Sequence, residues 1–153
     1  MPKRSRTSHL IVGLILVTVG GLIIWWSLNR ANSPRVIIGG DTILVEVADE
    51  KDEQERGLSG RPALPQNHGM LFVYQQPSRP GFWMKDMRFS IDIIWIGADS
   101  KIVAVLPNLS PDTYPAVFSP PEEVGSVQHV LEVNAGSAGR LNWQVGDQVQ
   151  IKL

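Results

Sequence analysis

The chain has 153 residues, of which 43% are hydrophobic and 19% charged, a composition typical of one globular domain. It contains no cysteine, which excludes disulfides, thiolate metal ligands and a cysteine nucleophile. From residue 35 onward, ten basic residues stand against all 15 acidic ones. The resulting net charge of −5 is opposite to the balance of a nucleic-acid-binding domain, so we exclude that class.

The N-terminal region predicts a membrane anchor. Residues 10–28 form an uncharged run of 19 residues, preceded by the basic tail 1–9. As a helix rising about 1.5 Å per residue, the run would span roughly 28 Å, close to the hydrocarbon core of a bilayer. Trp25 and Trp26 lie at its far end, where indole rings favour the membrane interface. We therefore predict a single-pass signal-anchor helix at 10–28, with a cytoplasmic tail and a periplasmic or extracellular C-terminal domain.

A cleaved signal peptide is the alternative to the anchor. The apolar run is longer than a usual signal h-region, and only a weak cleavage site is present, around Ala31. Residues 29–35 are expected to form a short polar linker, and residues 36–153 the globular domain.

The first elements of the domain are a hairpin and a helix. Residues 35–47 contain two β-branched runs around Gly39-Gly40-Asp41, a pattern typical of a hairpin. Residues 48–60 are the best helix candidate, with Asp49 as its N-cap and Gly57 or Gly60 as its end.

The rest of the domain reads mainly as short strands. Four strand-like runs are separated by turns rich in proline and glycine: 70–74, 82–85, 91–96 and 101–106. A long loop with five prolines, a further strand, a short helix and a final strand are predicted at 107–126, 127–133, 134–142 and 143–153. About seven short strands with one or two short helices predict a mostly β, α+β domain built on a compact, barrel-like mixed sheet.

The run FWMKDMRFSIDIIWI at residues 82–96 places charges among large apolar side chains. We expect Asp86 and Arg88 in a solvated connection, and Lys85 and Asp92 on the strands themselves. Both faces of the predicted strand 91–96 are apolar apart from Asp92, so the Asp92 carboxylate should lie at the edge of a buried surface. An unpaired carboxylate there would cost several kcal/mol, which predicts that Asp92 has partners or a raised pKa.

These charges predict a binding surface. Lys85 and Arg88 are the nearby cations for Asp92, and the motif ERGLSGRP supplies Arg56 and Arg61 from farther along the chain. We predict a ligand-binding surface, with no metal and no cofactor, made of Arg56, Arg61, Trp83, Lys85 and Asp92. The alternative is that Asp92 forms a structural ion pair or caps a turn.

A catalytic function is the first alternative to a binding function. An envelope hydrolase or transferase would use Asp92 as base and an arginine or lysine as oxyanion stabiliser, together with a second titratable group such as Glu132 or His129. Strand alternation puts Glu132 on one face with Gln128 and Val130, and that mixed face is expected to meet solvent.

A copper-binding accessory is the more remote alternative. It would use thioether and imidazole ligands, which suit Cu(I), from His68, Met70, Met84 and Met87. Met70 and Met84 are more typical of core side chains.

Four motifs occur in a characteristic order: RGLSGRPAL, HGMLFVY, GFWMKDMRFSIDIIWI and VLEVNAGSAGRLNWQVGDQV. Together they resemble the domain-of-unknown-function 192 family of small prokaryotic domains, often secreted or anchored, over about residues 36–153. The resemblance implies a compact mixed α/β domain with a barrel-like sheet, and no established reaction. The motif positions of that family fall here on Arg56, Gly57, Leu58, Arg61, Gly69, Met70, Leu71, Phe72, Phe82, Trp83, Met84, Lys85, Asp92, Leu131, Glu132, Gly136, Gly146 and Asp147. The chain departs from the family at Asp86-Met87, where Asn-Thr is frequent, and at Ser90, where proline is frequent.

The sequence as a whole predicts an uncharacterised extracytoplasmic domain anchored in the cell membrane. We expect a non-catalytic module that binds a ligand or a protein of the cell envelope, rather than an enzyme. Its expected partners are the membrane, through residues 10–28, and an unknown envelope ligand or protein, but no nucleic acid.

Overall fold

Nine strands and two short α-helices make up residues 33–153, the part of the chain that the computed structural model describes. The strands are β1 (Arg35–Ile38), β2 (Asp41–Ala48), β3 (His68–Ser78), β4 (Phe82–Trp83), β5 (Ile91–Ile96), β6 (Ile102–Leu109), β7 (Val117–Phe118), β8 (Val127–Asn134) and β9 (Val149–Lys152). The helices are α2 (Lys51–Arg56) and α3 (Ser137–Arg140), with 3-10 turns η1 (Pro111–Thr113) and η2 (Glu122–Val124).

The predicted tail at 1–9, the predicted anchor at 10–28 and most of the predicted linker lie outside the described residues. Within residues 33–153, no helix has the length and apolar character needed to cross a membrane.

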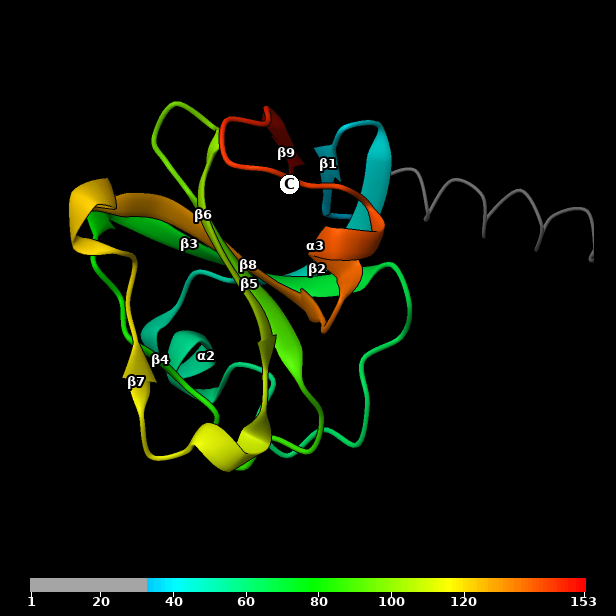
Figure 1. The fold of residues 1–153 in the computed structure, drawn as a ribbon, viewed down its shortest axis with the longest axis vertical. Helices are drawn as coiled ribbons and strands as arrows, with labels where there is room; N and C mark the ends of the chain where they lie inside the picture. Colours follow the sequence, from blue (N-terminus) through cyan, green and yellow to red (C-terminus); the bar gives the residue numbers. More distant parts are fainter. Residues whose placement is uncertain (1–32) are drawn as a thin grey trace, which may run out of the picture. The chain divides into compact units, whose positions relative to one another are not determined.

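Seven strands form one sheet in the order β6-β5-β8-β3-β2-β1-β9 (Figure 1). Neighbours are antiparallel except β2 and β3, which are parallel and connected through α2. The sheet curls until its edges meet, because Lys101 pairs with Gln148 and the Ile102 N–H donates to the Asp147 carbonyl at 3.0 Å. The predicted mostly β, barrel-like sheet is therefore confirmed as a curled half-barrel whose two edges are bridged.

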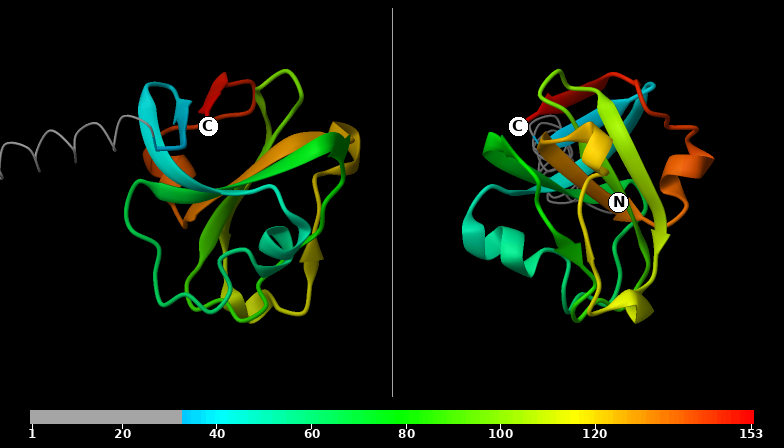
Figure 2. Two further views of the ribbon diagram at one scale, coloured as in Figure 1. Left: turned by 180° about the vertical axis from the view of Figure 1, so that it is seen from behind. Right: turned by 60° about the vertical axis from the view of Figure 1, so that its left-hand side comes forward.

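Each face of this sheet packs against its own core. Figure 1 shows α2, β4 and β7 on one side of the central strands and α3, β1 and β9 on the other, and Figure 2 shows the same arrangement from behind. The α2-side core includes Leu58, Met70, Phe72, Phe82, Met84, Ile93, Trp95 and Val130. The α3-side core includes Val36, Ile38, Leu71, Ile94, Ile96, Leu131, Val133 and Trp143. The central strands β3, β5 and β8 contribute to both cores, so neither of their faces meets solvent freely.

The hairpin predicted at 35–47 is confirmed by β1 and β2, which pair around Gly39-Gly40. The predicted helix is shorter than expected. It starts after Glu50 rather than Asp49, because Glu50 and Glu53 form a reciprocal capping box, and it ends at Gly57. The short helix predicted at 134–142 is present as α3.

The loop predicted at 107–126 contains more regular structure than expected. β6 continues through it to Leu109, and β7 pairs with β4, bringing Val117 opposite Trp83 and Phe118 opposite Phe82. The proline-rich segment thus forms a small second sheet over the α2-side core.

Candidate functional site

Glu132 lies on β8, an interior strand of the seven-stranded sheet. It is paired with Met70 of β3 on one side and Ile93 of β5 on the other. β3 can approach closely at this point because Gly69 has no side chain: a Cβ there would lie 2.6 Å from the Glu132 carbonyl oxygen. Any larger residue would push the two strands apart, so the backbone that carries Glu132 is held from both sides.

Glu132 is largely buried, and its carboxyl group forms no hydrogen bond with another described residue, although its oxygens are not fully enclosed. The residue is only 5% exposed, and its side chain shares a face with the α2-side core. Burial raises the pKa of Glu132 from its ordinary 4.5 to about 8, although the positive charge of Arg61 acts in the opposite direction. At pH 7 the group is therefore mostly protonated and neutral.

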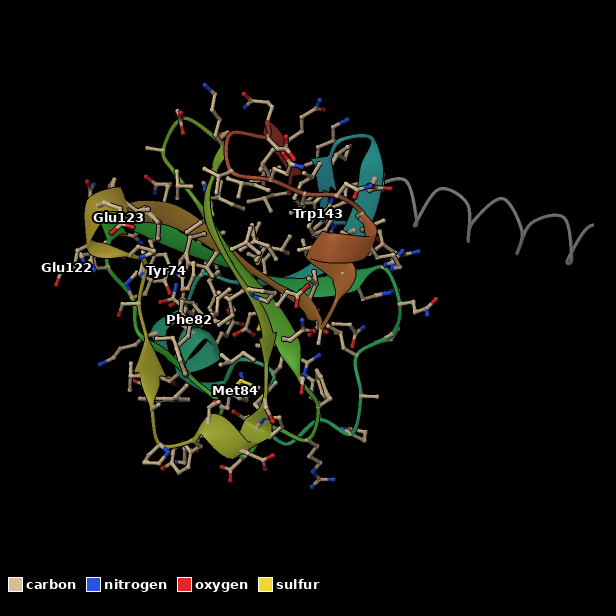
Figure 3. The ribbon with its side chains drawn as sticks, in the orientation of Figure 1. Tyr74, Phe82, Met84, Glu122, Glu123 and Trp143 are labelled. Carbon is tan, nitrogen blue, oxygen red and sulfur yellow. The ribbon has the colours of Figure 1, made fainter. Side chains whose placement is uncertain are left out.

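A cavity of about 260 Å³ opens beside this carboxyl group. We call it the Glu132 pocket, and it is lined by Lys51, Gln54, Glu55, Arg56, Gly57, Leu58, Ser59, Phe72, Tyr74, Pro80, Gly81, Phe82, Trp83, Met87 and Glu132. Figure 3 places two of these residues, Tyr74 and Phe82, on the side of the sheet that carries α2. The lining combines aromatic and apolar side chains from β3 and β4 with polar and charged side chains, most of them from α2.

The aromatic part of the lining comes from two strands. Phe72 and Tyr74 project from β3, while Phe82 and Trp83 form β4. The rings of Phe72 and Phe82 contact each other edge to face, with centroids 5.0 Å apart. Burial, and secondarily the neighbouring Glu132, raise the pKa of Tyr74 to about 12, so its hydroxyl is protonated at neutral pH.

The segment after α2 covers Glu132. Gly57 ends the helix with a φ of +50°, and a Cβ there would lie 3.5 Å from Phe72 Cζ and 4.0 Å from Glu132 Oε2. The next turn is tied to the end of β4, because the Ser59 hydroxyl donates to the Lys85 carbonyl at 2.8 Å. Glycine at position 57 therefore allows the positive φ that ends α2 and lets the backbone approach the Glu132 carboxyl group.

A second hollow of about 310 Å³ adjoins the other side of Gly57. It contains a bidentate ion pair between Arg61 and Glu46, with Nη2 2.8 Å from Oε2. The hydrogen bond from Arg61 lowers the pKa of Glu46. Arg56 lines both this hollow and the Glu132 pocket, and its exposed side chain forms no ion pair within residues 33–153.

Asp92 lies on the opposite face of the sheet from Glu132. It is fully buried on β5, opposite Val133, whereas the next residue, Ile93, is opposite Glu132. Its carboxylate accepts backbone N–H groups from Asn108 at 2.8 Å, Gly136 at 3.0 Å and Ala138 at 2.9 Å. The cations considered as partners, Lys85 and Arg88, form no ion pair with Asp92 among the described residues. Its partners are backbone amides of β6 and of the turn that begins α3, which agrees with the alternative that Asp92 caps a turn.

The structure brings together only part of the predicted binding surface. Arg56 and Trp83 both line the Glu132 pocket, and Arg61 lies in the adjoining hollow. Lys85 is exposed and lies in a turn after β4 rather than on a strand, and neither cavity includes it. Asp92 is separated from the pocket by the sheet itself. We therefore centre the candidate site on Glu132, with Arg56 and Trp83 at its opening.

The sequence singled out Glu132 as a second titratable group for catalysis and as a family motif position, but not as part of the binding surface, because its face of β8 was expected to meet solvent. That expectation is wrong, since α2 and the β4–β7 pair cover the face. A signal was available in the sequence: Met70, Phe72 and Tyr74 alternate along the neighbouring run, which indicates that this face of the sheet is apolar across strands.

The side chains considered for copper have ordinary structural surroundings. Met70 and Met84 are buried in the α2-side core, and His68 Nδ1 lies 2.9 Å from the Gln66 carbonyl oxygen. The described part of the chain contains no cluster of three or more histidine, aspartate or glutamate residues that could hold a metal ion.

The chain was compared with known proteins. No curated protein matches it significantly. Its fold is similar to that of a protein of unknown function from Novosphingobium aromaticivorans DSM 12444, with a TM-score of 0.70 and 30% identity, covering 76% of this chain and 83% of that one. It is also similar to a candidate transcription regulator from Sinorhizobium meliloti 1021, with a TM-score of 0.69 and 29% identity, covering 77% of this chain and 91% of that one. The family model DUF192, described as "Uncharacterized ACR", matches residues 35–151. The chain therefore belongs to the DUF192 family.

Proposed function

We propose that the domain is a small-ligand-binding module whose binding site is the Glu132 pocket. The observation that supports this most strongly is a carboxyl group that is almost fully buried, lies beside a cavity and has no hydrogen-bonding partner in the described part of the chain. A carboxyl group in the wall of a cavity, with no protein partner, can form hydrogen bonds with a ligand that enters the cavity.

The protonation states in the pocket disfavour one catalytic scheme, that of an ionised general base. Glu132 and Tyr74 both have raised pKa values, about 8 and about 12, so both carry their protons at pH 7. Neither is then an ionised general base. The carboxylate that the sequence suggested as a base, Asp92, has its two oxygens engaged with three backbone amides.

We also propose that the domain binds its ligand in the cell envelope. The apolar run at residues 10–28 supports a single-pass anchor with the domain in the periplasm or outside the cell. The description of the Sinorhizobium relative is not extended to this chain, because a net charge of −5 from residue 35 onward disfavours DNA contact.

Localisation has a direct test. The full chain with a C-terminal tag is expected in the membrane fraction after an alkaline carbonate wash, and the tag should be cleaved by protease added outside the inner membrane. Deleting residues 2–32 should release the protein into the soluble fraction. Recovery of the full chain in the cytoplasmic fraction would contradict the anchor and leave the pocket unaffected.

Ligand binding is tested on residues 34–153. These residues form one compact unit with both cores inside it, and a relative of which 91% is covered by this domain has a solved structure. We expect backbone NMR signals of Gly57 and Leu58 and the indole signal of Trp83 to shift with members of a panel of small aromatic amines, amides and carboxylates. Shifts confined to residues far from the pocket would contradict the proposal.

A matched pair of variants sharpens this test. Trp83→Ala and Tyr114→Ala each remove an exposed aromatic ring, but only Trp83 lines the pocket. Trp83→Ala should weaken binding of the same compounds by about tenfold, a typical loss for one aromatic wall. Tyr114→Ala should leave the affinity unchanged, and equal losses in the two variants would show that binding occurs elsewhere.

A further inference from the structure

The charged groups around Glu132 lie at different depths. From α2, Lys51, Glu55 and Arg56 stand at the opening, and all three are exposed. From β3, the hydroxyl group of Tyr74 is neutral at physiological pH. Arg61 acts on Glu132 from the adjoining hollow but is held by Glu46, and β5 contributes only the apolar Ile93. Glu132 is thus the deep acidic group of the pocket, and the cations lie at its edge or are already paired.

The walls of the pocket favour a positive charge over a negative one. Phe72, Tyr74, Phe82 and Trp83 surround the space beside Glu132. The face of an aromatic ring carries negative charge density, which attracts a cation and repels a carboxylate. The exposed cations at the opening are screened by water and salt, so they act weakly on a charge at the bottom of the pocket.

We propose that the Glu132 pocket binds an organic amine on a compact apolar body, with the ammonium group hydrogen-bonded to the Glu132 carboxylate among the aromatic side chains. This inference rests on the proposed function and names its ligand class. The cavity of about 260 Å³ limits the ligand to a small molecule or the amine-bearing end of a larger one. Arg56 and Lys51 stand where an anionic group at the far end of such a ligand would emerge.

Binding of an amine has a characteristic proton balance. The empty pocket holds a protonated Glu132 at pH 7, since burial raises its pKa to about 8. When an ammonium ion binds, the Glu132 proton leaves to solvent, and the pair formed is a carboxylate with an ammonium. One proton is released for each ligand bound, so affinity should rise about tenfold per pH unit from pH 6 towards 8. A carboxylate ligand would instead keep the proton on Glu132 and bind more weakly as pH rises.

The probes are phenethylamine, phenylacetamide and phenylacetate, which share an aromatic body and differ in the head group. Calorimetry on residues 34–153 in phosphate and in Tris gives both affinity and protons released. We expect phenethylamine to bind most tightly and to release close to one proton at pH 7. Tighter binding of phenylacetamide or phenylacetate, or amine binding without proton release, would overturn the proposal.

Two glutamate variants give a matched control. Glu132→Gln keeps the shape of the side chain but cannot become an anion, so phenethylamine binding should fall by about a hundredfold and proton release should disappear. Glu123→Gln removes an exposed carboxylate on η2, outside the pocket (Figure 3), and should change neither quantity. Equal binding to Glu132→Gln and the unchanged protein would overturn the assignment of Glu132.

The NMR results distinguish a failure of the amine assignment from a failure of the proposed binding function. If amides or carboxylates shift the signals of Gly57 and Trp83 while phenethylamine does not, the pocket is a binding site and the amine assignment is wrong. If no member of the panel shifts those signals, both the assignment and the proposed function are overturned.

Discussion

Two buried carboxyl groups occupy neighbouring positions on opposite faces of the same sheet and have contrasting surroundings. Asp92 accepts three backbone N–H groups and is completely enclosed. Glu132, one register position along in the paired strand, has no hydrogen-bonding partner among the described residues and lies beside a cavity. A carboxylate whose oxygens accept several backbone amides stabilises the fold, whereas a carboxyl group beside a cavity and without a protein partner is available to a ligand.

The largest expected effect comes from removing the Asp92 carboxylate. Asp92→Ala leaves three buried amides without an acceptor, so the free energy of unfolding of residues 34–153 should fall by at least about 3 kcal/mol. Asp92→Asn keeps the shape but turns one acceptor into a donor facing an N–H, and should cost about 2 kcal/mol. Urea unfolding measures both.

Asp99→Ala is the control for these variants, because Asp99 is an exposed partner of Lys101 at 3.9 Å and should contribute under about 1 kcal/mol. If Asp92→Asn left the stability unchanged, the contrast between the two carboxyl groups would disappear. The binding role predicted for Asp92 from the sequence would then regain support.

Glu132→Gln, in contrast, should raise the free energy of unfolding at high pH. The pKa of Glu132 in the folded protein is about 8, above its unfolded value of 4.5. Its contribution to stability is therefore complete below pH 4.5 and is lost as the pH rises through about 8. Glutamine carries no such dependence, so the variant should gain a few kcal/mol over the unchanged protein by pH 9 and almost nothing at pH 4.5.

Urea unfolding at several pH values between 4.5 and 9 measures that difference. The Glu123→Gln variant, altered at an exposed carboxylate, should follow the unchanged protein throughout. A Glu132→Gln variant that parallels the unchanged protein at every pH would show that Glu132 finds a partner in solution.

The smallest of these effects is expected at Gly57. Gly57→Ala must adopt a φ of +50° and place a methyl group near Phe72 and Glu132, so the free energy of unfolding should fall by about 1–2 kcal/mol. Gly139→Ala, in open space on α3, should be neutral or slightly stabilising. A Gly57→Ala variant as stable as the unchanged protein would mean that the covering turn over Glu132 is not fixed by glycine.

Much of the fold could be predicted from local patterns. The hairpin at β1 and β2 follows from β-branched runs around two glycines, and α2 follows from an acidic first turn and a terminal glycine. These features depend on neighbours in the sequence, and the barrel-like sheet follows from the number and spacing of such strands.

The site was less predictable, because it depends on contacts between distant segments. The neighbours of Asp92 in the sequence are apolar, which predicts that it is buried. The amides that donate to its carboxylate, however, lie 16 to 46 residues away in the sequence. The surroundings of Glu132 depend on α2 and β4, which reach β8 from parts of the chain at least 49 residues earlier. Neither contact can be predicted from the alternation of polar and apolar residues along a single strand.

The pairing of β1 with β9 has a consequence for how the domain is made. Arg35 lies opposite Lys152, so the first strand of the domain waits for a partner 117 residues later in the chain. During synthesis, β1 therefore keeps an unpaired edge until β9 has left the ribosome, and the bridge between the two sheet edges forms only then. Such distant contacts slow folding. A chain that stops before β9 would keep an open edge at β1, with which other chains could pair.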